Sequence, residues 1–539
     1  MHSRVERLKQ LQTTVPFDLL VVGGGATGCG IALDAATRGL RVALVDKNDF
    51  AEGTSSRSTK LLHGGVRYLE AAVRKLDLAQ YNLVREGLRE RALVLKNTPH
   101  LSRRIQLVTP LYAWFEVPYV FAGLKFYDLL AGDKNIGHSH LLGKNAALQR
   151  FPMLKAEGLK AGVLYYDGQF QDARMALAIA LTAQEHGAVI ANHVEVTALL
   201  KQEGRISGAR LVDRLSDRSW DLQARGVINA TGPFTDQMRR LDDPTAAALV
   251  KTSTGIHIVL DKECAPPDTG LMIPETDDGR VLFVLPWEGH ALVGTTDEPA
   301  GPVEHPRATE AEVDYLLHHI RRYFQLDICR DDVKAVWSGL RPLVLDPRAT
   351  DTATLARTHV VQQSASGLLT IAGGKWTTYR QMAEDLVDRA IQAFSLEPRA
   401  ACHTRSLVLH GGEEFRADED LRLQEAYQLA PDIARHLHRA YGDRAKEVCT
   451  LAHRLGLKNR LHPEHCYLEA EVVYAVRHEL AMRAADILVR RLSLGLVDKQ
   501  ASLTALPKVL QLMGEELGWS ESHCEQEREE ATTRLVEAI

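Results

Sequence analysis

Residues 17–46, FDLLVVGGGATGCGIALDAATRGLRVALVD, contain the pattern that decides the fold. Both ends of this stretch, Phe17–Val22 and residues 41–46, are short apolar runs typical of strands. Between them, residues 29–38 have the spacing of a helix, and Gly39 is well placed to end it. The stretch therefore predicts a β-α-β unit, and its strands are apolar enough to be buried on both faces of a parallel sheet.

The turn after the first strand, GGGATG from Gly23 to Gly28, fits the spacing G-x-G-x-x-G. Gly23 allows a tight turn, Gly25 lets backbone N–H groups approach a pyrophosphate, and Gly28 lets the helix pack closely on the strand. Asp46 ends the second strand eighteen positions after Gly28, where a carboxylate can accept a hydrogen bond from a ribose hydroxyl. The alternative is a glycine-rich turn without a ligand, but the flanking strand and helix favour a dinucleotide site.

Three further segments favour FAD over a nicotinamide cofactor. Residues 54–60, TSSRSTK, supply hydroxyls and cations that could line a pyrophosphate and a ribityl chain. Residues 230–232, ATG, end an apolar strand, as a second close approach of backbone to cofactor requires. Residues 372–375, AGGK, join a strand to a helix whose positive end would stabilise the negative charge of a reduced flavin. Taken singly, these segments are also explained by a solvated loop, a strand-to-turn ending and a helix cap.

Length and composition restrict the class of protein. A chain of 539 residues is too long for one compact core, so we expect two or three domains. The formal net charge of −5 argues against a general nucleic-acid binder, which needs positive charge to pair with phosphates. Seven cysteines without a CxxC pair favour reduced thiols over a disulfide framework or a zinc site, and no metal is expected. No apolar run approaches the ~18 residues needed to cross a bilayer, so we expect any membrane contact to be peripheral.

Longer motifs carry a resemblance to a known family. Residues 54–70, TSSRSTKLLHGGVRYLE, residues 338–343, SGLRPL, and residues 373–379, GGKWTTY, resemble the signatures of FAD-dependent glycerol-3-phosphate dehydrogenases. Their order and spacing extend the resemblance over nearly the whole chain. Residues 165–180, YYDGQFQDARMALAIA, are especially similar to the mitochondrial branch. The chain shows neither that branch's import segment nor the calcium-binding EF-hand extension of its animal members, so we expect a bacterial protein.

The resemblance implies an α/β fold of the D-amino-acid-oxidase type with three parts. These are a Rossmann-type FAD-binding domain, an antiparallel-sheet substrate domain and a C-terminal helical cap. Alternating apolar runs between residues 251 and 297 favour the antiparallel sheet, and the Leu/Ala/Glu/Arg-rich C-terminal sequence favours the cap. The expected boundaries are residues 17–100, 165–245 and 335–400 for the FAD-binding domain, 101–164 and 246–334 for the substrate domain, and 401–539 for the cap.

The same resemblance implies an activity and the residues that perform it. The expected reaction is oxidation of sn-glycerol 3-phosphate to dihydroxyacetone phosphate by hydride transfer to FAD. A pocket for this substrate needs at least two cations for the phosphate and one acceptor for the hydroxyl proton. Arg67, Tyr68, His257, Arg341 and Lys375 match family positions implicated in catalysis or substrate binding.

Each of these residues has an expected role. His257 is the candidate base, because an imidazole with a pKa near neutrality suits proton abstraction; its apolar neighbours leave a core histidine as the alternative. Arg341 is expected to polarise the substrate oxygen or to bind the phosphate, and the sequence does not separate these roles. Arg67, Tyr68 and Lys375 are expected to bind the substrate, although Arg67 taken alone would be a surface arginine. The residues expected to contact FAD are Gly23, Gly25, Thr27, Gly28, Asp46, Thr54, Ser55, Ser56, Lys60, His63, Gly64, Val194, Ala230, Thr231, Gly232, Gly373, Gly374 and Thr377.

Two segments bear on the electron acceptor. Aromatic residues within 112–127 could form an interfacial segment with Lys125 at the lipid headgroups, and a basic helix could add attraction to anionic lipid. The alternative is that the aromatics are buried between domains and the arginines form ion pairs.

Similarity to the mitochondrial branch favours a membrane quinone over oxygen, which a related branch of oxidases uses. We expect a peripheral protein on the cytoplasmic face of a bacterial inner membrane, with the choice between monomer and homodimer left open. The arginines of the basic helix are Arg477, Arg483, Arg490 and Arg491.

Three rival functions are less consistent with the sequence. An amino-acid or amine oxidase on the same fold usually needs one arginine for its substrate, whereas Arg67, Arg341 and Lys375 offer three cations. An FAD-dependent tRNA-modifying protein needs a basic surface and often a reactive cysteine, which the net charge and the cysteine pattern do not support. A non-catalytic flavoprotein subunit has no need of His257 together with these cations.

Overall fold

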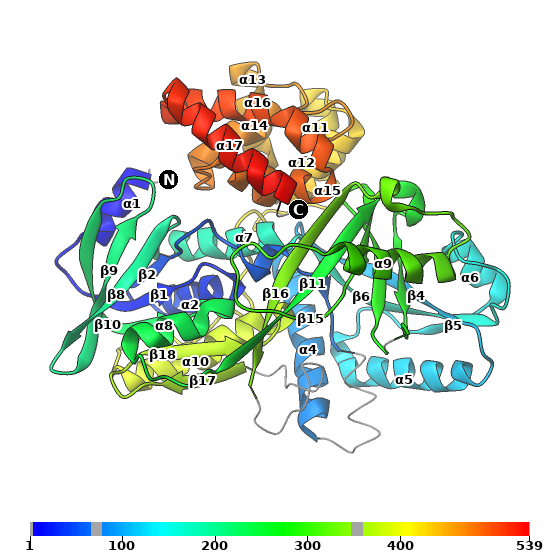
Figure 1. The fold of residues 1–539 in the computed structure, drawn as a ribbon, viewed down its shortest axis with the longest axis horizontal. Coiled ribbons are helices and arrows are strands. Elements are labelled where there is room, and N and C mark those ends of the chain that lie inside the picture. Colours follow the sequence, from blue (N-terminus) through cyan, green and yellow to red (C-terminus); the bar gives the residue numbers. More distant parts are fainter. Residues whose placement is uncertain (1–3, 66–77, 278, 346–358, 538–539) are drawn as a thin grey trace.

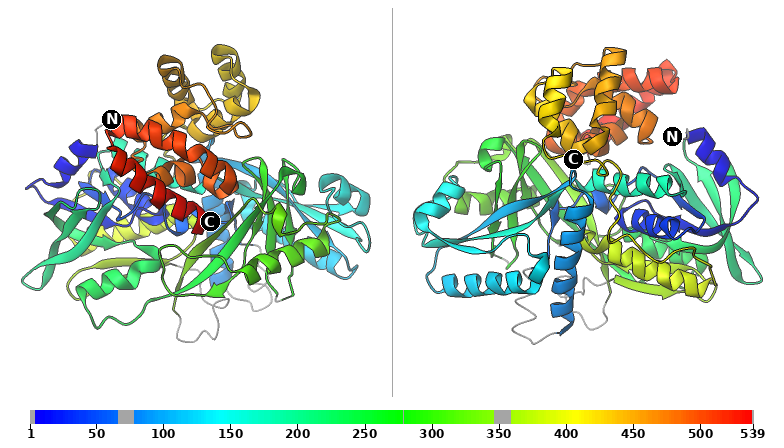
Figure 2. Two further views of the ribbon diagram at one scale, coloured as in Figure 1. Left: turned by 45° about the horizontal axis from the view of Figure 1, so that its top comes forward. Right: turned by 180° about the vertical axis from the view of Figure 1, so that it is seen from behind.

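Two β-sheets lie side by side in the computed structural model, and a layer of C-terminal helices sits over their junction (Figure 1 and Figure 2). The structure describes residues 4–65, 78–277, 279–345 and 359–537. Each sheet contains segments from widely separated parts of the chain, so the chain crosses between the sheets several times. This arrangement confirms the expected α/β fold, with a Rossmann-type first sheet, a largely antiparallel second sheet and a helical C-terminal part.

The first sheet has the strand order β17-β18-β10-β1-β2-β7. β1 (Phe17–Val22) pairs in parallel with β2 (Val42–Val45) and with β10 (Ser219–Asn229), and α2 (Ala26–Thr37) crosses between β1 and β2. Every residue of β2 and all of β1 except Asp18 are buried, as the apolar runs predicted. The other strands of this sheet are β7 (Val189–Ala191), β8 (Val194–Gln202), β9 (Arg205–Asp213), β17 (His359–Gln363) and β18 (Leu369–Gly373).

Different elements cover the two faces of the first sheet. On one face, α2, α7 (Asp172–Glu185) and α10 (Tyr379–Ala393) pack against Leu19 of β1. On the other face, Leu20 packs with β8, β9 and α1 (Arg4–Leu11). Successive residues of β1 therefore belong to two hydrophobic layers, as the alternation of side chains along a strand requires.

The second sheet has the order β15-β11-β14-β13-β12-β4-β6-β3, with β16 added on β11 and β5 added on β6. β11 (Val250–Leu260) and β16 (Ala335–Val344) pair along almost their whole length, and α9 (Glu310–Tyr323) packs on one face of the sheet. A capping box between Thr309 and Glu312 fixes the start of α9. The other strands are β3 (Leu61–Leu62), β4 (Ser102–Leu111), β5 (His140–Gly143), β6 (Ala161–Phe170), β12 (Thr269–Ile273), β13 (Leu282–Trp287), β14 (His290–Gly294) and β15 (Glu298–Pro299).

The domain boundaries expected from the sequence stay a prediction. Residue 165 lies inside β6 and residue 335 is the first residue of β16, and both strands belong to the second sheet. The segments that begin at residues 165 and 335 were predicted to belong to the FAD-binding domain. Each of them begins in a strand of the second sheet, so both sheets contain parts of these segments. The other α-helices in the described part of the body are α4 (Leu78–Asn97), α5 (Glu116–Ala131), α6 (Lys144–Arg150) and α8 (Thr235–Asp242).

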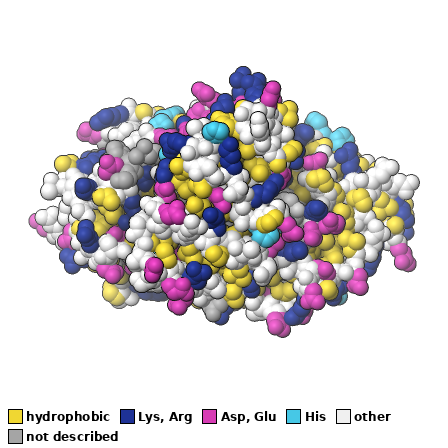
Figure 3. Space-filling view, turned by 90° about the horizontal axis from the view of Figure 1, so that it is seen from above, with side chains coloured by type: hydrophobic (Ala, Val, Ile, Leu, Met, Phe, Trp, Pro, Cys, Tyr) yellow, Lys and Arg dark blue, Asp and Glu magenta, His cyan; other side chains and the backbone are white. Residues whose placement is uncertain are grey.

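The C-terminal part of the chain is a helical layer. Its buried residues form one hydrophobic cluster with Leu285 and Trp337 of the second sheet, so the helices and that sheet share a core. Seen from above, the outer face of the layer carries basic and acidic side chains interspersed among apolar ones (Figure 3). The helices are α11 (Glu419–Tyr427), α12 (Pro431–Tyr441), α13 (Ala445–Leu455), α14 (Glu469–His478), the π-helical turn η8 (Asp486–Arg491), α15 (Leu494–Val497), α16 (Lys499–Leu517) and α17 (Glu521–Glu537).

Candidate active site

The turn between β1 and α2 has no room for a side chain at two of its glycines. Gly23 has a φ of +111°, and a Cβ on it would lie 2.5 Å from the carbonyl oxygen of Ala230 at the end of β10. A Cβ on Gly28 would lie 1.8 Å from the carbonyl oxygen of Gly23. Gly25 is the N-cap of α2, and Thr27 lies in its first turn. The close contacts agree with the roles expected for the first and third glycines of the motif.

The loop after β2 connects this turn to both sheets. Ser55 Oγ accepts a hydrogen bond of 2.9 Å from the backbone N–H of Ala26, the first residue of α2. The Ser55 carbonyl accepts a hydrogen bond of 2.9 Å from the indole N–H of Trp376, which follows β18. Thr54 Oγ1 donates to the carbonyl of Leu340 in β16 at 2.6 Å. Three segments that the sequence singled out separately therefore meet around Ser55.

Asp46 lies at the end of β2 with its carboxylate against the glycine turn. Its Oδ2 accepts a hydrogen bond of 2.6 Å from the backbone N–H of Gly24, and its Oδ1 accepts one of 2.8 Å from that of Asn48. Burial raises the pKa of Asp46 to about 6, although both hydrogen bonds act to lower it. The backbone N–H of Val194 donates to the Asp46 carbonyl at 2.7 Å, which places Val194 against the same strand end.

The ends of β10 and β18 use glycine where other residues would be strained. Gly232 has a φ of +57°, and the consecutive Gly373 and Gly374 have φ values of +78° and +82°. Thr231 Oγ1 donates to Asn229 Oδ1 at 2.7 Å, which fixes the end of β10. The backbone is therefore turned sharply at both positions where the sequence predicted a close approach to the cofactor.

His63 and Gly64 are held next to the segment after β18. His63 Nδ1 lies 2.5 Å from Asp167 Oδ2, and the His63 carbonyl accepts a hydrogen bond of 3.4 Å from Thr377 Oγ1. A Cβ on Gly64 would lie 2.3 Å from the hydroxyl oxygen of Tyr127, so the backbone packs directly on that side chain. These contacts join residues 63–64 to the predicted flavin-binding turn at residues 373–377.

Lys60 is fully buried and does not line an open surface. Its Nζ lies 2.7 Å and 2.8 Å from the two carboxylate oxygens of Asp172 and donates to the Ser56 carbonyl at 2.6 Å. The ammonium also lies over the rings of Trp287 and Trp337, 5.0 Å and 4.8 Å from their centroids. Because its charge is compensated inside the protein, Lys60 holds the loop in place, and its direct contact with FAD stays a prediction.

The paired strands β11 and β16 present the two predicted catalytic side chains on one face. His257 lies opposite Trp337, and the next pair on that face is Gly255 opposite Gly339, which Arg341 follows. A Cβ on Gly255 would lie 2.1 Å from an Nη atom of Arg341, so the guanidinium occupies the space that the missing side chain leaves. The two glycines therefore bring the imidazole and the guanidinium onto one patch of sheet.

His257 is buried, with an exposed fraction of 2%. Its ring stacks on Trp337 with 4.3 Å between centroids, and its Nε2 lies 3.0 Å from Thr59 Oγ1. Its Nδ1 has no hydrogen-bond partner among the described residues. Burial, followed by the charges of Lys60 and Arg341, lowers the pKa of His257 well below its usual value. The imidazole is therefore uncharged at neutral pH, the state that a proton acceptor requires.

Arg341 donates hydrogen bonds to four oxygen atoms of described residues. Its Nη1 donates to the Thr254 carbonyl at 3.0 Å and to Asp297 Oδ1 at 3.1 Å. Its Nη2 donates to Thr295 Oγ1 at 2.8 Å and to the Thr296 carbonyl at 2.9 Å. The sequence analysis missed Asp297, and the only signal for it was a carboxylate just after an apolar strand in the expected substrate domain. These contacts give the guanidinium one orientation, as a residue that aligns a substrate needs.

The structure does not place every predicted site residue. Arg67 and Tyr68 lie outside the described residues, so their expected roles stay predictions. Lys375 directly follows Gly374 in extended backbone and is half-buried. Around residues 54–60 the structure brings together the glycine turn, the segment after β18, His257 and the stretch of β16 that precedes Arg341.

Comparison with known proteins gives this arrangement a family. The family model described as FAD dependent oxidoreductase matches residues 18–380, and the one described as C-terminal domain of alpha-glycerophosphate oxidase matches residues 402–524. The mitochondrial glycerol-3-phosphate dehydrogenase of Mesocricetus auratus is 48% identical over 99% of this chain and 75% of its own length. The chain belongs to the FAD-dependent glycerol-3-phosphate dehydrogenase family.

Other members of this family agree with the assignment. A probable mitochondrial glycerol-3-phosphate dehydrogenase of Caenorhabditis elegans is 47% identical over 98% of this chain and 75% of its own length. The solved structure of the glycerol-3-phosphate dehydrogenase from Bacillus halodurans complexed with FAD superimposes with a TM-score of 0.80 at 31% identity. That match covers 99% of this chain and 98% of the solved chain. The chain is therefore an oxidoreductase that uses FAD.

The glycine turn fits FAD on its own geometry. Its first and third glycines have no space for a Cβ, and the turn leads directly into the N-terminus of α2, the kind of helix end that binds a pyrophosphate. Asp46 lies at the adjacent strand end, where the adenosine ribose would meet a carboxylate. The turn at Gly373 and Gly374 is tied to the same loop through the hydrogen bond from Trp376 to Ser55, and it would supply a second backbone surface for the cofactor. The chemistry and the space of these residues therefore fit FAD, and their contacts with it stay predictions.

The aromatic segment before and within α5 divides into two sets. Tyr127 is buried and packs with Leu88 of α4, which fixes α5 on the body of the protein. Trp114, Phe115 and Tyr119 are 67%, 79% and 51% exposed, so the alternative that all of these aromatics are buried between domains is wrong. No described helix is long and apolar enough to cross a membrane.

The predicted basic face near the C-terminus does not exist as expected. Arg490 and Arg491 are 3% and 2% exposed, and both form ion pairs with Asp49. Arg477 and Arg483 pair with glutamates of α16 and α17. The prediction that these arginines attract anionic lipid is therefore wrong for the two buried ones. The spacing alone could not show this, because the partners lie far away in the sequence.

Proposed function

We propose that this enzyme oxidises sn-glycerol 3-phosphate to dihydroxyacetone phosphate and passes the electrons to a membrane quinone. The observation that carries the proposal is the shared face of β11 and β16, where an uncharged imidazole and a fixed guanidinium lie beside the cofactor loop. A secondary alcohol that bears a phosphate needs a proton acceptor and at least two cations. The names of relatives that match nearly the whole of this chain, glycerol-3-phosphate dehydrogenases, support this substrate.

In this proposal the chain's own residues bind the substrate and move its hydroxyl proton. FAD supplies the hydride acceptor for the carbon that carries the hydroxyl. His257 takes the hydroxyl proton, because it is uncharged and has a ring nitrogen without a partner among the described residues. Arg341 polarises the substrate oxygen or holds the phosphate, and Lys375, Arg67 and Tyr68 complete the binding site.

The exposed side of α5 favours a membrane quinone over oxygen as the acceptor. Trp114, Phe115, Tyr119 and Leu129 combine large apolar area with high exposure on one segment, and Leu129 is 72% exposed. Exposed apolar patches on soluble proteins mark interaction sites, and Trp and Tyr are frequent at lipid headgroups. Lys125, on the same helix, is 44% exposed and could meet lipid phosphates. We place the enzyme on the cytoplasmic face of a bacterial inner membrane, held there by α5.

The substrate is tested by mixing the purified yellow protein anaerobically with glycerol 3-phosphate and following the flavin absorbance. We expect rapid bleaching with glycerol 3-phosphate and none with glycerol. If the protein holds intact FAD and its absorbance does not change, the proposed substrate is contradicted. Amino acids and amines would then be tested as substrates. Reoxidation of the bleached enzyme by a quinone analogue, measured against dissolved oxygen, then separates a dehydrogenase from a glycerol-3-phosphate oxidase.

A further inference from the structure

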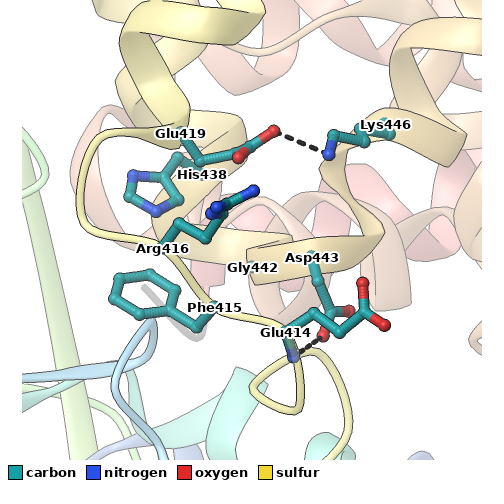
Figure 4. A pocket seen from close by; sticks show the side chains of 8 residues that line it. All are labelled: Glu414, Phe415, Arg416, Glu419, His438, Gly442, Asp443 and Lys446. Atoms are coloured by element: carbon teal, nitrogen blue, oxygen red, sulfur yellow. Dashed lines mark hydrogen bonds and ion pairs between the residues drawn. The ribbon is translucent and has the colours of Figure 1, made fainter.

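A second site lies in the helical C-terminal part of the chain, in a cavity of about 370 Å³ between the loop before α11 and the junction of α12 and α13 (Figure 4). It shares no lining residue with the candidate active site. We propose that this cavity binds a free α-amino acid, with the ammonium group at its buried end and the carboxylate at its cationic edge. The volume lies in the range of ~300–1,000 Å³ that small-ligand pockets occupy.

The buried end of the cavity presents hydrogen-bond acceptors that lack donors. His438 is 6% exposed, and its Nε2 has no hydrogen-bond partner among the described residues. The imidazole donates its other hydrogen bond to the backbone of Arg416, so Nε2 is left as an acceptor. Its ring stacks on Phe415 at 4.7 Å between centroids, with 9° between the planes, which fixes its direction. Burial lowers the pKa of His438, so the ring stays uncharged at neutral pH.

Glu419 adds a second acceptor at the same end. It is 4% exposed, and Lys446 Nζ lies 2.9 Å from its Oε1. Its Oε2 has no hydrogen-bond partner in the part of the chain that the structure describes. A buried carboxylate oxygen without a donor is costly, so a ligand that brings N–H groups would be stabilised here. An ammonium group is a donor suited to acceptors of this kind.

The charge of the lining selects against phosphates. With His438 uncharged, two cations against three carboxylates leave a net charge of about −1, which disfavours a dianion and favours a ligand that carries a positive group. The Arg416 side chain extends beneath the Glu419–Lys446 pair, where it can meet a carboxylate (Figure 4). A zwitterion matches both ends. The charged residues of the lining are Glu414, Arg416, Glu419, Asp443 and Lys446.

The walls of the cavity are fixed before any ligand binds. Gly442 has a φ of +58°, and a Cβ on it would lie 1.8 Å from the carbonyl oxygen of Gly411. The backbone N–H of Asp443 donates to that same carbonyl at 2.9 Å, and Asp443 Oδ2 accepts a hydrogen bond of 2.8 Å from the backbone N–H of Glu414. The loop is thus tied to the start of α13, so a ligand meets a site that is already formed.

The test is isothermal titration calorimetry of the full-length enzyme with bound FAD. The twenty free α-amino acids are first screened by thermal shift, alongside ethylamine, acetate and inorganic phosphate. We expect saturable binding of at least one amino acid at one molecule per chain, tighter than that of ethylamine, acetate or phosphate. No binding by any amino acid, or equal binding of phosphate, would overturn the proposal.

Variants with matched controls locate the binding. Glu419→Gln and Arg416→Gln are each expected to weaken the amino acid by at least tenfold, and Arg416→Gln should leave ethylamine unaffected. Glu425→Gln and Arg422→Gln alter exposed residues of α11 outside the lining and should bind as the unmodified protein does. Because Arg416 is exposed, its variant keeps the test decisive even where the buried Glu419 variant does not fold. Unchanged affinity in Arg416→Gln would assign the binding elsewhere.

Discussion

Asp49 and Arg491 lie 442 positions apart in the sequence and form a buried, bidentate ion pair. Arg491 Nη1 lies 2.6 Å from Asp49 Oδ2, and its Nη2 lies 3.0 Å from Oδ1. Arg490 donates to the same carboxylate at 2.6 Å. Asp49 follows Asp46, the predicted ribose contact, by three residues, and it precedes the loop at residues 54–60. The helical layer therefore holds the segment that shapes the cofactor site.

Replacing Arg491 by Gln should destabilise the protein and loosen its FAD. Removing one partner of a buried pair leaves charge uncompensated, and we expect a loss on the order of 3 kcal/mol in the free energy of unfolding. Burial acts to raise the pKa of Asp49, but Arg491 and Arg490 hold it far below its usual value. The stability is therefore present at neutral pH and is lost as pH falls below the ordinary carboxyl range. Chemical denaturation and the FAD content after gel filtration measure the two effects.

Arg477→Gln is the matched control for this prediction. Arg477 pairs with Glu516 but is 36% exposed, so its loss should change the free energy of unfolding by no more than ~1 kcal/mol. Equal free energies of unfolding and equal FAD contents in the two variants would show that the helical layer does not stabilise the cofactor site through Arg491.

The affinity of the apoprotein for FAD should rise as pH increases from 5 to 7. The pKa of Asp46 is raised to about 6, so the carboxylate that would accept from the ribose is mostly protonated at pH 5. If only the ionised form binds well, the dissociation constant should be about tenfold lower at pH 7 than at pH 5. The folding stability of the apoprotein has the opposite dependence on pH. The contribution of Asp46 to that stability is full below the pKa of this carboxyl in the unfolded chain, and it is lost as pH rises through about 6.

Fluorescence quenching of FAD on titration with apoprotein at several pH values measures this dependence. Asp46→Asn should bind FAD more weakly and with a flat pH profile. A profile that is equally steep in the Asn variant would assign the titration to another group.

The parts of the fold that were predictable from sequence are those with local causes. β1, α2 and β2 follow from two apolar runs and a glycine turn, and Gly23 and Gly28 are in fact sterically required. Within the site, His257 and Arg341 were named from the resemblance, but their common face depends on the register of β11 and β16, which no local pattern specifies.

The failures have a common physical origin in partners that are distant along the chain. Lys60 lies in a polar loop that looks solvated, yet Asp172 draws its ammonium into the interior. Arg490 and Arg491 have the spacing of a basic surface, yet their carboxylate partner precedes them by more than 400 residues. A charge run is ambiguous until its counter-charges are placed, because the same residues suit a solvated face or a buried network.

His257→Ala should slow flavin reduction by glycerol 3-phosphate about 10²- to 10⁴-fold while FAD remains bound, as expected for loss of a general base. Burial and two nearby cations keep the pKa of His257 well below its usual value, so the ring stays uncharged on the acid side of neutrality. The rate in the unmodified enzyme should therefore not fall between pH 7 and pH 6, where an ordinary histidine would become protonated. Stopped-flow reduction across this range measures both effects. A near-normal rate in the alanine variant would remove His257 as the base and leave it a core histidine stacked on Trp337.

The exposed apolar side chains just before and on α5 should bind liposomes through burial of apolar area, with little dependence on salt. The buried arginines of the C-terminal layer supply no basic surface, and Lys125 is the one cation of α5, whose described residues run from 116 to 131. Trp114→Ser combined with Phe115→Ser removes two side chains that are 67% and 79% exposed, and it should abolish sedimentation with liposomes without changing anaerobic flavin reduction. Leu421→Ser is the control, because Leu421 is 64% exposed but lies on α11 in the helical layer. This variant should sediment with liposomes as the unmodified protein does. Release of the unmodified protein by high salt would instead show that electrostatic attraction dominates. Equal sedimentation of the double variant would place the membrane contact, and with it the route to the quinone, away from α5.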